Sequence, residues 1–116
     1  NEKVFVYSIL SFLIFRSLEQ IRNNVCHNNL DVKLIGGGGG FSYSAQGISH
    51  NTTEDLSIIR SLPNINVFNP GSKIETELAL SSTFNTKGPS FIRLGKAPAI
   101  DYFQKKPEVE VHIFRN

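Results

Sequence analysis

The chain opens with two hydrophobic patterns that predict a strand followed directly by a helix. Val4–Ile9 is an apolar run without polar alternation, which is typical of a strand covered on both faces in a parallel sheet. From Leu10 the apolar residues recur at helical spacing instead, so they form one narrow stripe that we expect to pack on the sheet. The members of this stripe are Leu10, Ile14, Leu18, Ile21 and Val25.

Further short apolar runs predict the remaining strands. Three of them are continuous: Val32–Ile35, Ile65–Phe68 and Phe91–Leu94. The first of these runs straight into five consecutive glycines, Gly36 to Gly40. Near the end of the chain, apolar residues alternate at Val109, Val111 and Ile113, which predicts a last, half-exposed strand.

Start signals predict two helices between these strands. Thr52, with Asp55 three residues later, is a candidate N-cap for a short helix that ends before Pro63. Ser72 and Glu75 form a capping-box pattern at the start of the next helix. The apolar side of that helix is made of Ile74, Leu78 and Phe84.

The alternation of strands and helices predicts an α/β fold with a doubly wound, mostly parallel sheet and helices on both faces. Ligands bind at the carboxyl ends of the strands in such sheets. We expect residues 1–97 to form a partial domain, and residues 98–116 to be a linker and the start of a following segment. The chain has no methionine and begins at Asn1, so we expect it to be part of a longer or processed polypeptide.

Composition narrows the expected partners and location. Hydrophobic residues make up 40% and charged residues 19% of the 116 positions, as in ordinary globular domains. The 12 basic and 10 acidic residues are scattered, which argues against a nucleic-acid or membrane partner. The apolar run from Val4 to Phe15 is too short to span a bilayer. Cys26 is the single cysteine, so we expect an intracellular, cytoplasmic protein.

Three side chains near the predicted strand ends are candidates for chemistry. Phe12 and Phe15 lie off the core stripe at the start of the first helix, where a flat ligand ring could stack. Filling a second core layer or a subunit interface is the alternative, and before any resemblance is considered it is the favoured one. His50 lies in a polar loop, and a neutral imidazole can give or take a proton near pH 7. The alternative for His50 is a solvated loop histidine.

Two other features are weaker candidates. The glycine run follows a strand, but no Gly-Lys-Ser/Thr and no helix start follow it, so a phosphate-binding loop is not predicted. A flexible loop near a site is the better interpretation. His27 lies beside Cys26, but two ligands do not make a metal site, and none is predicted.

The loop sequence Gly47-Ile48-Ser49-His50 is the centre of an ordered series of motifs. The others are Ser11–Phe15, Glu54–Leu56, Arg60–Asn64, Pro70 with Glu75, and Gly88–Ser90 leading to Arg93. Together they resemble the pyrimidine-binding domain of transketolase-like, thiamine-diphosphate-dependent enzymes, whose central motif is Gly-Pro-Thr-His. The resemblance extends from about Val4 to Lys96, and its specificity lies in the combination and order of the motifs.

The resemblance implies roles for the candidate residues. His50 would face the substrate near the reacting carbon of the cofactor. Phe12 and Phe15 would line the slot for the aminopyrimidine ring, with Phe15 favoured as the stacking partner. Lys96 falls where transketolases usually place an arginine that holds the substrate phosphate. A lysine keeps the charge there but lacks the bidentate fork.

The resemblance also implies a reaction and partners. The expected enzyme transfers or ligates a two-carbon ketol unit on sugar phosphates in carbohydrate metabolism. Its cofactor is thiamine diphosphate, with magnesium held by a partner domain or subunit, and a homo- or hetero-oligomer is expected. The glutamate that activates the cofactor lies upstream of the matched region in this family. The isolated chain is therefore not expected to be active.

Departures from the family pattern keep other functions open. Gln46 stands where the family often has an acidic residue, and Gly38 falls where transketolases have a histidine. Both favour a non-catalytic structural or interaction module of the same fold. A fragment of a deoxyxylulose-phosphate synthase or of a 2-oxoacid dehydrogenase β chain is another alternative, and an unrelated doubly wound nucleotide-binding domain is a third.

Overall fold

The computed structural model describes residues 2–96, which form an α/β fold around a parallel sheet. The strands are β1 (Val4–Ile9), β2 (Val32–Gly37), β3 (Asn66–Phe68) and β4 (Ser90–Leu94). They lie in the order β1-β2-β4-β3. This confirms the predicted fold class and four predicted strands, although β2 continues into the glycine run. The predicted segments 98–107 and 109–113 lie outside the described residues.

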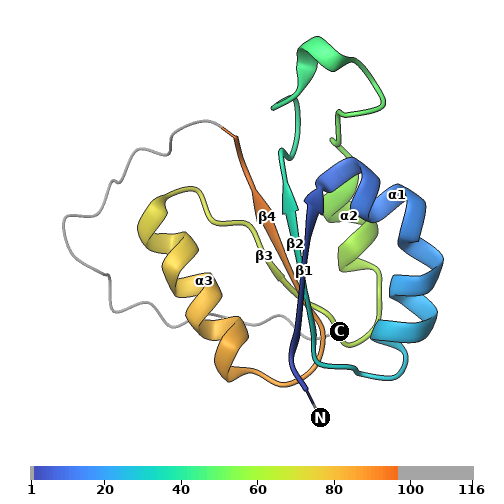
Figure 1. The fold of residues 1–116 in the computed structure, drawn as a ribbon, viewed down its shortest axis with the longest axis vertical. Helices are drawn as coiled ribbons and strands as arrows, with labels where there is room; N and C mark the ends of the chain where they lie inside the picture. Colours follow the sequence, from blue (N-terminus) through green and yellow to red (C-terminus); the bar gives the residue numbers. More distant parts are fainter. Residues whose placement is uncertain (1, 97–116) are drawn as a thin grey trace.

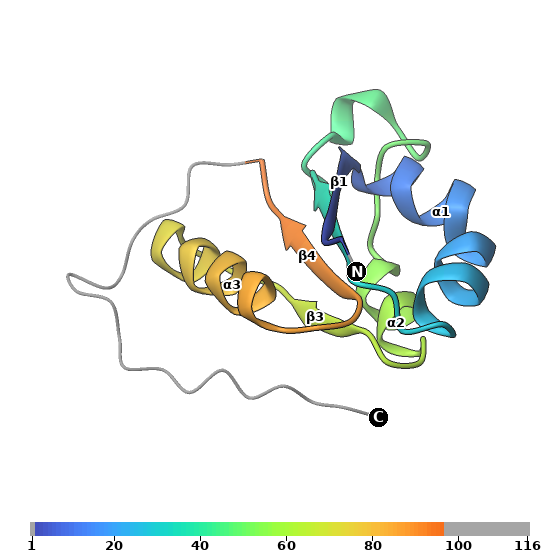
Figure 2. The ribbon, with the colours of Figure 1, turned by 60° about the horizontal axis from the view of Figure 1, so that its bottom comes forward.

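Helices cover both faces of this sheet (Figures 1 and 2). They are α1 (Leu10–Gln20), which continues as a π-helix over Ile21–Cys26, α2 (Asp55–Arg60) and α3 (Lys73–Asn85). The crossovers through α1 and α2 advance in one direction along the sheet, whereas the crossover through α3 returns from β3 to β4. Because crossovers between parallel strands are right-handed, α3 lies on the face opposite α1 and α2.

Most of the core lies between the sheet and the face covered by α1 and α2. The predicted helical stripe faces this core, because Leu10, Ile14 and Ile21 are buried in the same cluster as Phe91 of β4. The face under α3 holds a smaller cluster made of Phe68, Ala79 and Ile92. The predicted apolar side of α3 is wrong at Phe84, which is 64% exposed.

The first strand is less covered than its composition predicts. Val4–Ile9 was expected to be covered on both faces, but its residues from Val4 to Tyr7 are all exposed, Tyr7 by 70%. The reason is its position, since among the described residues β1 is an edge strand that pairs with β2 alone. The apolar run therefore predicted the strand correctly, but it did not predict how much of the strand is buried by neighbouring elements.

The two predicted helix starts have opposite outcomes. Ser72 caps α3 as predicted, because its Oγ accepts a hydrogen bond from the Glu75 backbone N–H at 3.2 Å. Thr52 does not cap α2, whose N-cap position is held by Glu54 without a side-chain hydrogen bond. Instead, Thr52 is buried and its backbone forms an isolated antiparallel bridge with Gly40. Thr52 therefore forms a backbone pairing with Gly40 instead of the helix cap that the local sequence predicted.

Candidate functional site

The carboxyl ends of three adjacent strands define the candidate site (Figure 1). β1 leads into the first turn of α1, which carries Phe12. β2 leads through the glycine run into the loop that carries His50, and β4 leads to Lys96. Because parallel strands end at the same edge of a sheet, residues far apart in the sequence meet there.

The glycine run forms the base of the loop that carries His50. Gly38 and Gly39 both donate backbone hydrogen bonds to the carbonyl oxygen of Leu94, at 2.8 and 3.2 Å. Gly40 and Thr52 exchange two backbone hydrogen bonds, at 2.8 and 3.0 Å. The loop between residues 41 and 51 is therefore closed at its base and joined to the end of β4.

An ion pair also ties the start of α2 to the glycine run. Arg93 Nε donates to Asp55 Oδ2 at 2.5 Å, with the Asp55 side chain 1% exposed and that of Arg93 20% exposed. A Cβ atom placed on Gly39 would lie 2.6 Å from Arg93 Cζ. The guanidinium therefore lies directly against the Gly39 backbone, and the pair joins β4, α2 and the glycine run beneath the loop.

His50 lies between two aromatic rings. Its ring centroid is 4.9 Å from that of Phe12 and 6.1 Å from that of Tyr43, with both pairs edge-to-face. Nδ1 is 3.0 Å from Ser49 Oγ, and Nε2 has no hydrogen-bond partner within residues 2–96. Depending on the tautomer, Nε2 can donate or accept a hydrogen bond. The packing thus holds the imidazole while leaving one nitrogen available to a ligand.

Lys96 joins this group through Tyr43. Its Nζ lies 4.6 Å from the centroid of the Tyr43 ring, within the range of a cation–π interaction. The structure therefore brings together three of the predicted site residues, Phe12, His50 and Lys96. Tyr43 was not predicted, because an aromatic residue in a polar loop follows no periodic pattern that would indicate contact with a site. The same loop also carries Phe41, which is 68% exposed, so residue type alone does not distinguish the two.

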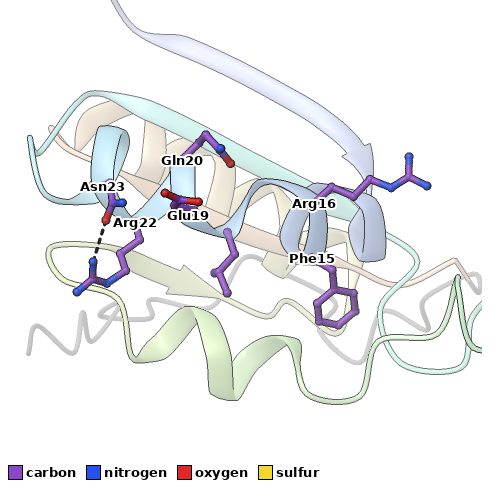
Figure 3. Close-up of a pocket in the computed structure, with 7 residues that line it drawn as sticks. Phe15, Arg16, Glu19, Gln20, Arg22 and Asn23 are labelled. Atoms are coloured by element: carbon purple, nitrogen blue, oxygen red, sulfur yellow. Dashed lines mark hydrogen bonds between the residues drawn. The ribbon is translucent and has the colours of Figure 1, made fainter.

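Phe15 lies apart from this group, on the outer face of α1 (Figure 3). It is 44% exposed and has no ring partner among the described residues. It lines a shallow pocket of about 460 Å³ that also includes Arg16, Leu18, Glu19, Gln20, Arg22 and Asn23. The pocket follows α1 and includes neither Phe12 nor His50. The exposed ring face of Phe15 is available for stacking, but of the two phenylalanines only Phe12 contacts His50.

Buried polar atoms without a hydrogen-bond partner gather where the loop meets α2. They are Asn51 Oδ1, Thr52 Oγ1 and Asp55 Oδ1, and Ser11 Oγ in the first turn of α1 is a fourth. Asp31 Oδ1, away from this edge, is also without a hydrogen bond but forms an ion pair with Lys33. Such atoms are rare in native structures and call for a functional or structural explanation. Their positions after β1 and β2 agree with a polar ligand site at this edge of the sheet.

The remaining reactive groups are not organised for catalysis. Burial raises the pKa of the Cys26 thiol to about 11, so this thiol is a poor nucleophile. The pKa of Glu54 is lowered by hydrogen bonds from its own backbone N–H and from that of Thr53.

Within residues 2–96, no three histidine, cysteine or acidic side chains are grouped to hold a metal ion. None of the helices in that range has the length and hydropathy needed to span a membrane.

These features define a class of protein: an α/β domain that presents an aromatic and cationic wall at the carboxyl edge of a parallel sheet. The family model "Transketolase, pyrimidine binding domain" matches residues 2–99. The chain therefore belongs to the transketolase pyrimidine-binding domain family, as its motifs indicated.

Individual relatives agree with this assignment. The chain is 29% identical over 104 residues to a subunit of apulose-4-phosphate transketolase from Phocaeicola vulgatus, covering 90% of this chain and 33% of that protein. It is 39% identical over 83 residues to the protein of the same name from Actinobacillus succinogenes, covering 72% and 27%. A solved structure described as "Split gene transketolase, inactive beta4 tetramer" superposes with a TM-score of 0.78 at 31% identity, covering 91% of this chain and 33% of that one. The chain thus spans about a third of these relatives.

Proposed function

We propose that the chain is part of a cytoplasmic, transketolase-type enzyme that uses thiamine diphosphate to transfer or ligate a two-carbon ketol unit on sugar phosphates. In this proposal it supplies the pyrimidine-side wall of the active site. The observation that carries the proposal is His50, held between Phe12 and Tyr43 with Nε2 open at the carboxyl edge of the sheet. The relatives named as transketolase subunits support the reaction class.

The residues of this wall suit part of the cofactor. Thiamine diphosphate, when bound, supplies the electron sink for breaking and forming carbon–carbon bonds. The exposed ring of Phe15 offers a stacking face for an aminopyrimidine, while Phe12 supports the histidine. The side chains around His50 are aromatic and cationic, whereas magnesium requires oxygen ligands. We therefore assign the diphosphate and its magnesium ion to other parts of the assembly. The family resemblance implies that the activating glutamate lies upstream of the matched region.

A partner subunit or domain is part of this proposal. The similar solved structure is described as an inactive β4 tetramer of a split-gene transketolase. The two similar proteins from Phocaeicola vulgatus and Actinobacillus succinogenes are each named as one subunit of a transketolase, which implies another subunit. By analogy, we expect this chain to act in a homo- or hetero-oligomer together with a diphosphate-binding domain or subunit.

Two side chains receive distinct roles toward the substrate. His50 Nε2 would donate a hydrogen bond or a proton to the substrate oxygen that gains negative charge during the reaction. Lys96 would attract the phosphate at the other end of the substrate as a point charge, without the two parallel hydrogen bonds that an arginine provides. The two residues therefore act at opposite ends of one sugar phosphate.

Replacing His50 tests the proposal in the full-length protein reconstituted with its diphosphate-binding partner. A group that acts on developing charge contributes mainly in the transition state, so His50→Ala should lower kcat by roughly 10²–10⁴-fold. Thiamine diphosphate affinity, measured by calorimetry, should change little. His27→Ala is the matched control, because His27 is exposed and lies outside the site.

The results separate two candidate functions. An unchanged kcat for His50→Ala would remove this residue from the chemistry. A wild-type assembly that binds thiamine diphosphate but transfers no ketol unit from any sugar phosphate would favour a non-catalytic module. Gly38 and Gln46, which replace polar and acidic residues of the family pattern, are the observations that favour this second candidate.

A further inference from the structure

Tyr43 occupies the space in which a side chain at position 38 would stand. Gly38 has φ +82°, and a Cβ atom placed on it would lie only 2.0 Å from Cε2 of Tyr43 and 2.5 Å from its Cδ2. The aromatic ring therefore lies directly on the Gly38 backbone. Glycine at 38 suits tyrosine at 43, because a larger residue at 38 would collide with the ring and would be strained at this φ.

The same ring links the two charged or titratable groups of the site. Lys96 Nζ lies 4.6 Å from its centroid, and the His50 ring lies 6.1 Å from it in an edge-to-face arrangement. The Tyr43 hydroxyl makes no hydrogen bond to any residue within 2–96. The contacts of Tyr43 thus come from the ring itself, which separates an ammonium group from an imidazole.

We propose that Tyr43 is a positioning residue that holds the Lys96 ammonium at the carboxyl edge of the sheet and thereby sets the preference for substrates with an anionic end. A free lysine samples many rotamers and loses this freedom when it binds an anion. A ring face that attracts the ammonium restricts the lysine before binding, so less entropy is lost on complex formation. The proposal rests on the proposed function, and its substrate class is phosphorylated sugars.

The test compares two substitutions at Tyr43 in the reconstituted full-length enzyme. Tyr43→Phe keeps the ring, whereas Tyr43→Leu removes the ring face but retains an apolar side chain against Gly38. Cation–π contacts at exposed sites correspond to about a two- to fivefold change in affinity. Tyr43→Leu should therefore raise KM for fructose 6-phosphate by about two- to fivefold. Tyr43→Phe should behave like the wild type.

Two controls identify Lys96 as the group through which Tyr43 acts. Tyr43→Leu also removes the edge-to-face contact with His50, so its kcat/KM for unphosphorylated fructose measures that loss, and the loss for fructose 6-phosphate should exceed it by about two- to fivefold. In a Lys96→Gln background, Tyr43→Leu should cause no further rise in KM, because the cation has already been removed. An equal loss in Tyr43→Phe, or an undiminished loss in the Lys96→Gln background, would overturn the proposal.

A second measurement does not depend on catalysis. Reductive ¹³C-methylation gives each lysine an NMR signal, and the Lys96 signal is assigned by its absence in Lys96→Gln. This signal should shift in Tyr43→Leu but not in Tyr43→Phe, and Tyr43→Leu should weaken its response to inorganic phosphate. An assembly without ketol transfer would contradict the proposed function alone. An unchanged Lys96 signal in Tyr43→Leu would overturn the role of Tyr43.

Discussion

The ion pair between Asp55 and Arg93 should determine how firmly the His50 loop is closed. Asp55→Asn is the sharpest perturbation, because it removes the charge while preserving the shape of the side chain. The asparagine can still accept a hydrogen bond from Arg93 Nε through its amide oxygen. Its NH₂ group would then occupy the place of Asp55 Oδ1, which is buried and has no partner among residues 2–96.

The magnitude follows from these two changes. Replacing a charge-assisted hydrogen bond by a neutral one loses about 1 kcal/mol, and burying an unpaired donor costs about 1–3 kcal/mol. The lower end of the second range applies, because the wild type already leaves an unpaired polar atom, Asp55 Oδ1, at the same place. We therefore expect Asp55→Asn to lower the free energy of local opening by about 2 kcal/mol.

Hydrogen exchange measured by mass spectrometry reports this opening directly. The backbone amides of Gly40 and Thr52 close the base of the loop, and their exchange should accelerate roughly 30-fold. Peptides within β4 serve as an internal reference. Glu54→Gln is the matched control, because Glu54 is the neighbouring carboxylate and is exposed. Equal exchange in both variants would refute the reasoning that the buried ion pair holds the loop.

Two further predictions concern stability and cofactor binding. The hydrogen bond from Lys33 and the charges of Lys33 and Lys3 hold the pKa of Asp31 below its usual range. The stabilisation by this carboxylate is therefore present above about pH 4 and is lost as pH falls through the folded-state pKa. Asp31→Asn should therefore flatten the decline of Tm below about pH 4. Identical Tm profiles of the variant and the wild type would contradict this. The isolated chain should bind thiamine diphosphate weakly or not at all in calorimetry with magnesium, provided that circular dichroism shows it to be folded. Submicromolar affinity would show that the chain holds the whole cofactor site.

Much of the fold could be predicted because its signals are local. The change from a continuous apolar run to helical periodicity at Leu10 placed the boundary between β1 and α1 correctly. The capping of α3 by Ser72 also depends on residues within one turn. The exposure of β1 was missed, because burial depends on which strands and helices lie next to it and not on its own composition.

The candidate site also has residues that the sequence could indicate and residues that it could not. Phe12, His50 and Lys96 were recognisable from residue type and from motifs that follow predicted strands. The roles of Thr52 and Asp55 could not be recognised in this way. A cap pattern shows neither that Thr52 pairs with Gly40 nor that Asp55 pairs with Arg93.

The sequence by itself determined the order of strands and helices, the family and the identity of His50 as the main candidate for proton transfer. Only the tertiary structure decided that Tyr43 lies on Gly38, between Lys96 and His50. The physical reason is that secondary structure follows from periodicity between near neighbours. The site, in contrast, is made of side chains on loops that meet only because parallel strands end at one edge of the sheet.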